Sequence, residues 1–267
     1  MHKSWRWRAV AIGSVALLGL GACSGDDDDD ASASESDTEA DAPAEDPKAD
    51  AVAFCDAIAD MGIGVSIGDG YEQVDDALLA AEEVAPDEIS AAVTTMADES
   101  RAQVADGPPP EGTPPSLPPD EYFAAAAEVG EYMADSCDYQ VIDVTATEHA
   151  FAGVPAEAAR GKTLVRLTND GAEYHHLVLQ RVHYGETRSV EEILALPEGG
   201  DLLDYQGSAF APPGHGSWFV VELGIGRQAL MCIIPTGSTT AEELRSGQAD
   251  HSPTHDTKGE TADIQVS

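Results

Sequence analysis

The sequence predicts a small α-helical bundle followed by an all-β sandwich or barrel, and three observations support this fold class. Residues 46–140 carry apolar side chains at helical steps of three and four. After residue 138 the pattern changes to short runs rich in Val, Ile, Leu and Thr, with turn residues between them. An acidic stretch without aromatic residues precedes both parts. We therefore expect a multidomain α + β protein behind a disordered segment.

The first 22 residues have the pattern of an export signal. A basic start leads into an apolar stretch, residues 9–20, which is too short to cross a membrane as a helix. The stretch ends in Leu20-Gly21-Ala22-Cys23, which resembles the lipobox of bacterial lipoproteins. This resemblance implies a signal peptide over residues 1–22 and a lipid on Cys23. The protein would then be lipid-anchored in the cell membrane at its extracytoplasmic face. The alternative is an ordinary secretory signal with a chance cysteine.

Residues 23–47 are predicted to form an acidic, disordered tether. Residues 24–50 contain twelve acidic side chains and one lysine, so their mutual repulsion favours an extended chain. The whole chain has a formal net charge of −37. Phosphate contacts require Lys and Arg, so nucleic acid is excluded as a partner class.

The helical domain is expected over residues 48–138. Phe54 and Ile58 lie on one face of its first helix, and a last helix is predicted over about 120–136. Cys55 and Cys137 fall on the first and last helices. Outside the cytoplasm two such thiols are expected to form a disulfide, which would pin the bundle. The region contains no histidine and no pattern that indicates catalysis.

The strand-rich domain is expected over residues 139–267, with one helix at 189–197. Its predicted strands are short and apolar, and they lie at 139–151, 161–169, 174–182, 216–223, 227–235 and 261–267. Cys232 stands in the fifth of these runs. With Cys23 acylated and the other two cysteines paired, this thiol is left over. It is therefore a structural buried cysteine, an exposed reactive thiol or a metal ligand.

The strand Gly161–Asn169, the turn after it and the run His-His-Leu-Val-Leu that begins at His175 resemble the cupredoxins, the class of plastocyanin and azurin. So does the strand that runs from Gly226 to Cys232 and continues as Cys-Ile-Ile-Pro. The resemblance covers roughly residues 138–267. It implies an all-β cupredoxin-like Greek-key sandwich that binds a single copper ion.

The resemblance also implies a ligand set. The histidine that opens a strand corresponds to His175, the cysteine that ends another strand to Cys232, and the second histidine to His255. The position of the weak methionine ligand is occupied by Glu260. The residues themselves agree in part, because strand alternation places His175 on the apolar, inward face with Leu177. Two imidazoles and a thiolate are the donors of a blue-copper centre.

Several positions depart from the family pattern and leave alternatives open. Glu260 puts a charged oxygen where the family has a thioether, and it either ligates or points to solvent. Tyr174 and Gln228 also differ from the residues common at their positions. His251 lies in the same long loop as His255 and rivals it as the second histidine ligand. Zinc in place of copper, or no metal at all, is an alternative cofactor state.

The predicted function is electron transfer or copper handling at the cell surface, with a redox or envelope protein as a possible partner. The alternative is a copper-free cupredoxin-like module that binds another envelope protein. We predict that the protein is not an enzyme, since no Ser-His-Asp or paired-carboxylate pattern occurs in the sequence. The remaining candidates, His149, His183 and His215, are interpreted as surface histidines.

Overall fold

The computed structural model describes residues 47–59, 71–106, 117–245 and 252–267. The predicted signal peptide, Cys23, almost all of the tether and His251 lie outside these residues. Residues 44–267 form one compact unit. Within the part of the chain that the structure describes, no helix combines the length and apolar character needed to cross a membrane.

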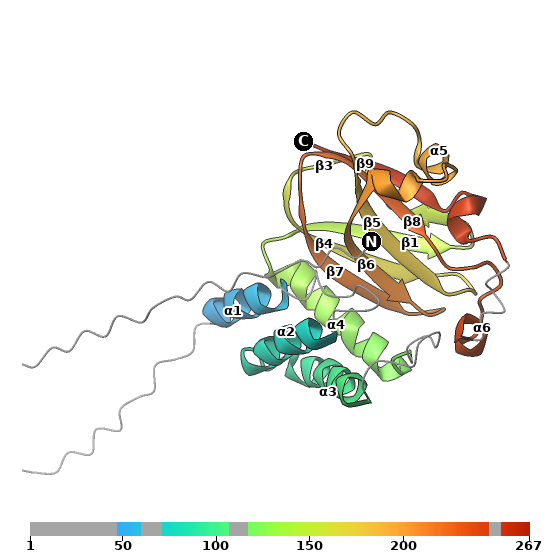
Figure 1. The fold of residues 1–267 in the computed structure, drawn as a ribbon. Coiled ribbons are helices and arrows are strands. Elements are labelled where there is room, and N and C mark those ends of the chain that lie inside the picture. Colours follow the sequence, from blue (N-terminus) through green and yellow to red (C-terminus); the bar gives the residue numbers. More distant parts are fainter. Residues whose placement is uncertain (1–46, 60–70, 107–116, 246–251) are drawn as a thin grey trace, which may run out of the picture. The chain divides into compact units, whose positions relative to one another are not determined.

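Four helices precede the strands (Figure 1). They are α1 (Pro47–Ala59), α2 (Tyr71–Glu83), α3 (Ser90–Asp106) and α4 (Asp120–Ser136). The bounds of α4 match the predicted 120–136. Pro86 lies in the connection between α2 and α3, where its carbonyl accepts a hydrogen bond from the Ile89 N–H at 3.0 Å.

Among the described residues, nine strands form two sheets. The first sheet has the order β2-β1-β4-β7 and comprises β1 (Gln140–Thr147), β2 (Ala150–Ala152), β4 (Gly161–Asn169) and β7 (Gly216–Leu223). The second has the order β3-β9-β8-β5-β6 and comprises β3 (Glu157–Ala158), β5 (His175–Val182), β6 (Leu203–Ala211), β8 (Gly226–Cys232) and β9 (Thr261–Val266). Both sheets are mixed, since β1 pairs with β4, and β3 with β9, in parallel.

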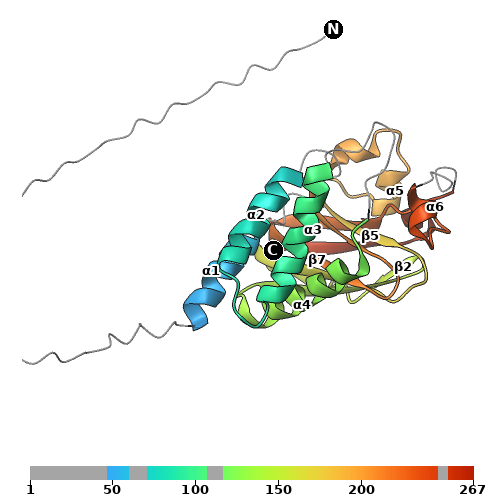
Figure 2. The ribbon, with the colours of Figure 1, turned by 90° about the horizontal axis from the view of Figure 1, so that it is seen from below.

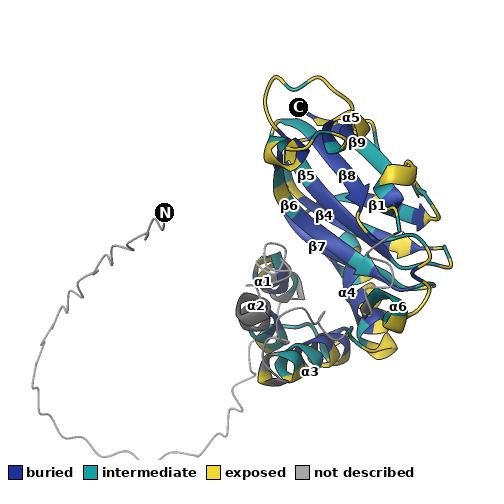
Figure 3. Ribbon diagram, turned by 45° about the vertical axis from the view of Figure 1, so that its right-hand side comes forward, coloured by how far each residue is buried: buried dark blue, intermediate teal, exposed yellow. Residues whose placement is uncertain are grey.

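The two sheets pack face to face around an apolar core, which Figure 3 shows as the buried interior of the strands. Leu177 and Leu179 of β5 point into this core together with Leu230 of β8 and Phe219 of β7. The neighbouring Val178 belongs to a smaller cluster outside the second sheet, which the short helix α5 (Val190–Leu194) covers. The alternation predicted for β5 is therefore confirmed, and the end of the strand places His175 on the core side.

The helices cover the outer face of the first sheet (Figure 2). Their core includes three side chains from the sandwich, Leu164, Trp218 and Val220. The Trp218 indole N–H donates to the Ala126 carbonyl of α4 at 2.6 Å. A Cβ added to Gly130 would lie 2.8 Å from the Trp218 ring, so α4 approaches the sheet closely. The two parts thus share a hydrophobic core, and the boundary at residues 138/139 stays a prediction.

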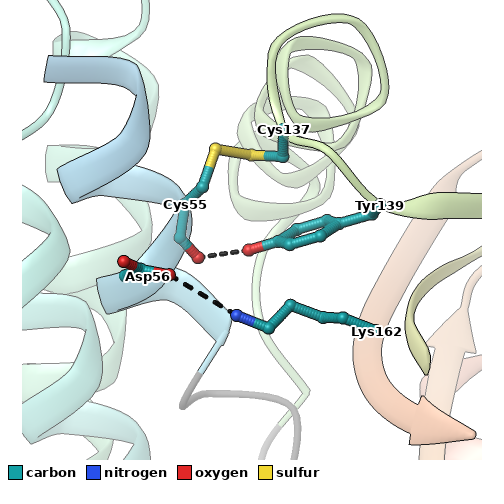
Figure 4. The surroundings of a disulfide bond; sticks show 5 residues. All are labelled: Cys55, Asp56, Cys137, Tyr139 and Lys162. Carbon is teal, nitrogen blue, oxygen red and sulfur yellow. Dashed lines mark hydrogen bonds and ion pairs between the residues drawn. A yellow bond between two sulfur atoms is a disulfide. The ribbon is translucent and has the colours of Figure 1, made fainter. Parts of the chain in front are cut away.

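The predicted disulfide is present between Cys55 of α1 and Cys137 at the end of α4 (Figure 4). Beside it, the Tyr139 hydroxyl donates to the Cys55 carbonyl, and the Lys162 ammonium of β4 lies 3.5 Å from Asp56 Oδ1. The ion pair is half exposed and adds little stability. The predicted all-β sandwich, preceded by a disulfide-linked helical bundle, is therefore confirmed.

Removing this disulfide should destabilise the protein strongly. The bridge links residues 82 positions apart, and closing such a loop is worth about 4–5 kcal/mol in the chain-entropy view. Urea unfolding of the double variant Cys55→Ser/Cys137→Ser, compared with the parent under identical non-reducing conditions, measures the loss. An unchanged unfolding midpoint would contradict this expectation.

One long strand, β6, was not predicted from the sequence. Its middle, Gln206-Gly207-Ser208, has low β-propensity and interrupts the apolar pattern. The structure supplies the reason for the glycine, because a Cβ at Gly207 would lie 2.5 Å from the Phe219 ring of the facing sheet. The strand is therefore specified by packing across the sandwich and by pairing with β5.

Candidate metal centre

Four buried side chains meet where β5 begins and β8 ends. His175 is the first residue of β5, Cys232 the last of β8, His255 opens the short 3-10 turn η4 (His255–Lys258), and Glu260 follows that turn. All four side chains are fully buried. One ligand atom from each lies within 4.8 Å of all the others. The structure thus brings together the four residues that the sequence nominated.

Backbone hydrogen bonds build this arrangement from distant segments. An isolated bridge between Pro235 and Thr254 folds the long loop back. The His255 N–H then donates to the Ile234 carbonyl at 2.9 Å, two residues beyond Cys232. Glu260 follows the turn η4 directly, so the backbone has to reverse its direction there to bring the Glu260 side chain into the same cluster. Gly259, with φ of 102°, makes that turn in the left-handed region that favours glycine.

Each histidine directs the same atom, Nδ1, toward the thiol. Cys232 Sγ lies 3.8 Å from Nδ1 of His175 and 3.4 Å from Nδ1 of His255. Glu260 presents one oxygen to each imidazole, with Oε1 at 2.7 Å from Nδ1 of His175 and Oε2 at 3.0 Å from Nδ1 of His255. The His176 backbone N–H also donates to Cys232 Sγ, at 3.3 Å.

The spacing of these atoms fits a small metal ion. Bonds of about 2.0 Å to N or O and 2.3 Å to S place neighbouring ligand atoms of a tetrahedral ion roughly 3.3–3.5 Å apart. The contacts of 2.7–3.8 Å lie on both sides of that range. Within the described residues, neither oxygen of Glu260 has a hydrogen-bond partner despite these short distances. The four ligand atoms therefore lie close enough together to hold one metal ion.

The charges of the cluster agree with this arrangement. Burial alone lowers the pKa of His175, but the adjacent Cys232 and Glu260 raise it to about 9. Burial also lowers the pKa of His255, and its contacts with Cys232, Glu260 and Glu173 raise it to about 10. Burial raises the pKa of the Cys232 thiol, but hydrogen bonds with His175, His255 and the His176 N–H bring it below its ordinary value. A metal ion binding here would displace a proton from each imidazole and meet a thiolate.

The donor set indicates which metals suit the site. Thiolate and imidazole are ligands of copper, and a carboxylate adds a harder oxygen. Zinc accepts the same mixture of N, S and O. The possibility that Glu260 points to solvent is wrong, because its side chain is fully buried and faces both histidines.

Two side chains that contact His255 were missed by sequence reasoning. His149 is not a surface histidine: its ring packs edge-on against His255 with centroids 5.2 Å apart, and its Nδ1 is buried. Glu173 places Oε2 at 3.0 Å from Nε2 of His255. No motif in the sequence marks either residue, and only the fold brings them to His255. By contrast, His183 and His215 lie partly exposed beside carboxylates, at 3.2 Å from Asp204 and 3.7 Å from Asp120.

No protein-family model matches the chain, and no curated protein matches it. Among solved structures, the chain is similar to reduced auracyanin from the photosynthetic bacterium Roseiflexus castenholzii, with 17% identity over 48% of this chain and 97% of that one and a TM-score of 0.30. Auracyanin A, a "blue" copper protein from Chloroflexus aurantiacus, has 15% identity over 48% and 98%, with a TM-score of 0.29. A multicopper oxidase has 17% identity over 49% and 43%, with a TM-score of 0.27. Similarity at this level carries no argument about function, so the case for a metal rests on the four side chains themselves.

Proposed function

We propose that this protein binds a single copper ion through His175, Cys232, His255 and Glu260 and serves in electron transfer or copper handling, without an enzymatic activity of its own. The observation that supports it is the convergence of one thiolate, two imidazole nitrogens and a carboxylate inside a fully buried cluster. Bound copper would supply one-electron redox chemistry.

The surroundings of the cluster suit this role. Cys232 and the strand that begins with His175 are held in register, because Leu177 pairs directly with Cys232 across β5 and β8. The Cys232 N–H donates to the Glu260 carbonyl at 3.2 Å, which ties a third ligand to the same strand end. The paired strands therefore hold His175 and Cys232 in fixed relative positions. Burial of all four side chains keeps water away from the thiolate.

The direct test is to add Cu(II) or Zn(II) to the purified protein and to record metal content and absorption. We expect one copper ion per chain and a thiolate-to-copper charge-transfer band. A protein that retains zinc but no copper would have a structural metal site, and the redox proposal would fail. A protein that retains neither metal and shows no band would instead be a metal-free binding module of the cell envelope.

We also propose that the protein works at the extracytoplasmic face of the membrane, anchored by lipid on Cys23, with a redox or envelope protein as partner. The lipobox-like run before Cys23 and the acidic stretch after it support this.

Substitution Cys23→Ser should release the protein from the membrane. A single cysteine that carries the acyl chains provides the whole of the proposed attachment, so its loss leaves no lipid contact. Cell fractionation measures the distribution, and intact mass of the parent shows the added lipid. Cys232→Ser is the matched control, because it also removes one thiol but should leave the protein in the membrane fraction. Equal membrane content in both variants would refute the anchor.

A further inference from the structure

The side chain of Glu173 is held at the edge of the metal cluster by contacts from several segments. It lies two residues before His175, in the loop between β4 and β5. Its Oε2 accepts the Gly237 N–H at 2.5 Å and lies 3.0 Å from Nε2 of the fully buried His255. One carboxylate oxygen therefore meets both the loop that follows Cys232 and the far side of a predicted ligand.

The backbone of Glu173 is fixed as well. Its carbonyl accepts a hydrogen bond from the side-chain amide of the buried Asn169 at 2.8 Å. Its N–H donates to Oε1 of Glu148 at 3.2 Å, and the same oxygen accepts the N–H of Ala172. The carboxylate is thus preorganised where His255 needs it. These backbone hydrogen bonds hold Glu173 in one position within the loop between β4 and β5.

The chemistry of imidazole gives this contact a purpose. A carboxylate at Nε2 holds a proton on that nitrogen, which leaves the lone pair of Nδ1 for a metal and makes it a better donor. Nδ1 of His255 is the nitrogen that faces Cys232, at 3.4 Å. His175 differs, because within the described residues its Nε2 is buried without a hydrogen-bond partner. The strand end orients His175, whereas His255 opens a loop turn and depends on a side chain.

We infer that Glu173 is a positioning residue of the copper site: its carboxylate fixes the ring of His255 so that Nδ1 points at the metal, and its negative charge favours Cu(II) over Cu(I). The effect of Glu173 on copper rests on the proposed function. Its effect on the orientation of the His255 ring rests on geometry alone. Glu173 does not touch the metal-facing atoms itself.

The test compares Glu173→Gln with Asp170→Asn. Both substitutions remove one negative charge from the loop between β4 and β5 and keep the size of the side chain, but Asp170 is exposed and its backbone N–H donates to the Ala146 carbonyl at 3.0 Å. Glu173→Gln should weaken copper binding roughly 10–100-fold in a chelator competition, as loss of an outer-shell partner does, and should raise the reduction potential. Asp170→Asn should leave affinity within about twofold, because no ligand loses its partner. Equal affinity and potential in the two variants would overturn the inference.

A second measurement on the metal-free protein separates this inference from the proposed function. Proton NMR should show a slowly exchanging Nε2–H of His255 in the parent and in Asp170→Asn, and this signal should be absent in Glu173→Gln. If the parent retains no copper, the proposed function fails while this signal still tests the role of Glu173. If copper is retained but the signal is the same in all three proteins, only the role of Glu173 fails. Should Glu173→Gln not fold, Glu173→Asp provides the comparison, since its shorter side chain cannot keep both contacts and should also weaken copper binding.

Discussion

Replacing Cys232 with serine should abolish the copper centre. The thiolate is the only soft donor of the cluster, and the charge-transfer band requires a copper–sulfur bond. Loss of copper affinity should exceed the roughly 10–100-fold that removal of an outer-shell partner costs. Serine is close to isosteric, and the protein should keep its fold because the hydroxyl can hydrogen-bond to His175 or His255 in place of the thiol. Copper titration followed by absorption and metal analysis measures the effect.

Met231→Leu is the matched control for this experiment. Met231 precedes Cys232 on β8, but its side chain belongs to the apolar cluster outside the second sheet with Val178. The substitution therefore removes a sulfur from the same strand without entering the site. We expect copper binding and the band to match the parent. A band that survives in Cys232→Ser would show that copper binds elsewhere, and the proposed site would be wrong.

The second large effect is expected for Glu260→Met. A carboxylate is harder than a thioether and negatively charged, and both properties favour Cu(II) over Cu(I). Glu260 is fully buried and lies within 3.0 Å of Nδ1 of both His175 and His255, so its charge acts at short range. Methionine should raise the reduction potential by roughly 60–120 mV, which corresponds to a ten- to hundredfold weaker preference for Cu(II). The blue band should also become stronger.

Redox titration of the copper-loaded parent, Glu260→Met and Glu260→Gln separates the contributions. Glutamine keeps the shape and an oxygen donor but removes the charge. The difference in reduction potential between the parent and Glu260→Gln therefore measures the effect of the charge, and the difference between Glu260→Gln and Glu260→Met measures the effect of the donor atom. Identical potentials and spectra in all three would mean that Glu260 is not a ligand, although it lies in the cluster.

The sequence by itself determined the local elements, and its resemblance to the cupredoxins implied the candidate ligands. The helical spacing of apolar side chains placed α4 at its observed bounds. Period-two alternation placed His175 on the core side of β5, and the count of cysteines left Cys232 unpaired while Cys55 and Cys137 joined. These features depend on neighbours along the chain or on composition, so they can be read without a fold. The assignment of His175, Cys232, His255 and Glu260 as ligands stays a prediction.

Only the tertiary structure decided which distant groups meet. The bridge between Pro235 and Thr254 brings His255 back to the end of β8, and Gly259 turns the chain so that Glu260 enters the same buried space. Glu173 reaches His255 across 82 residues of sequence. β6 and the helical layer on Trp218 likewise depend on close approach between facing surfaces. Long-range packing selects these contacts through shape and burial, and neither quantity has a local signature in the order of the residues.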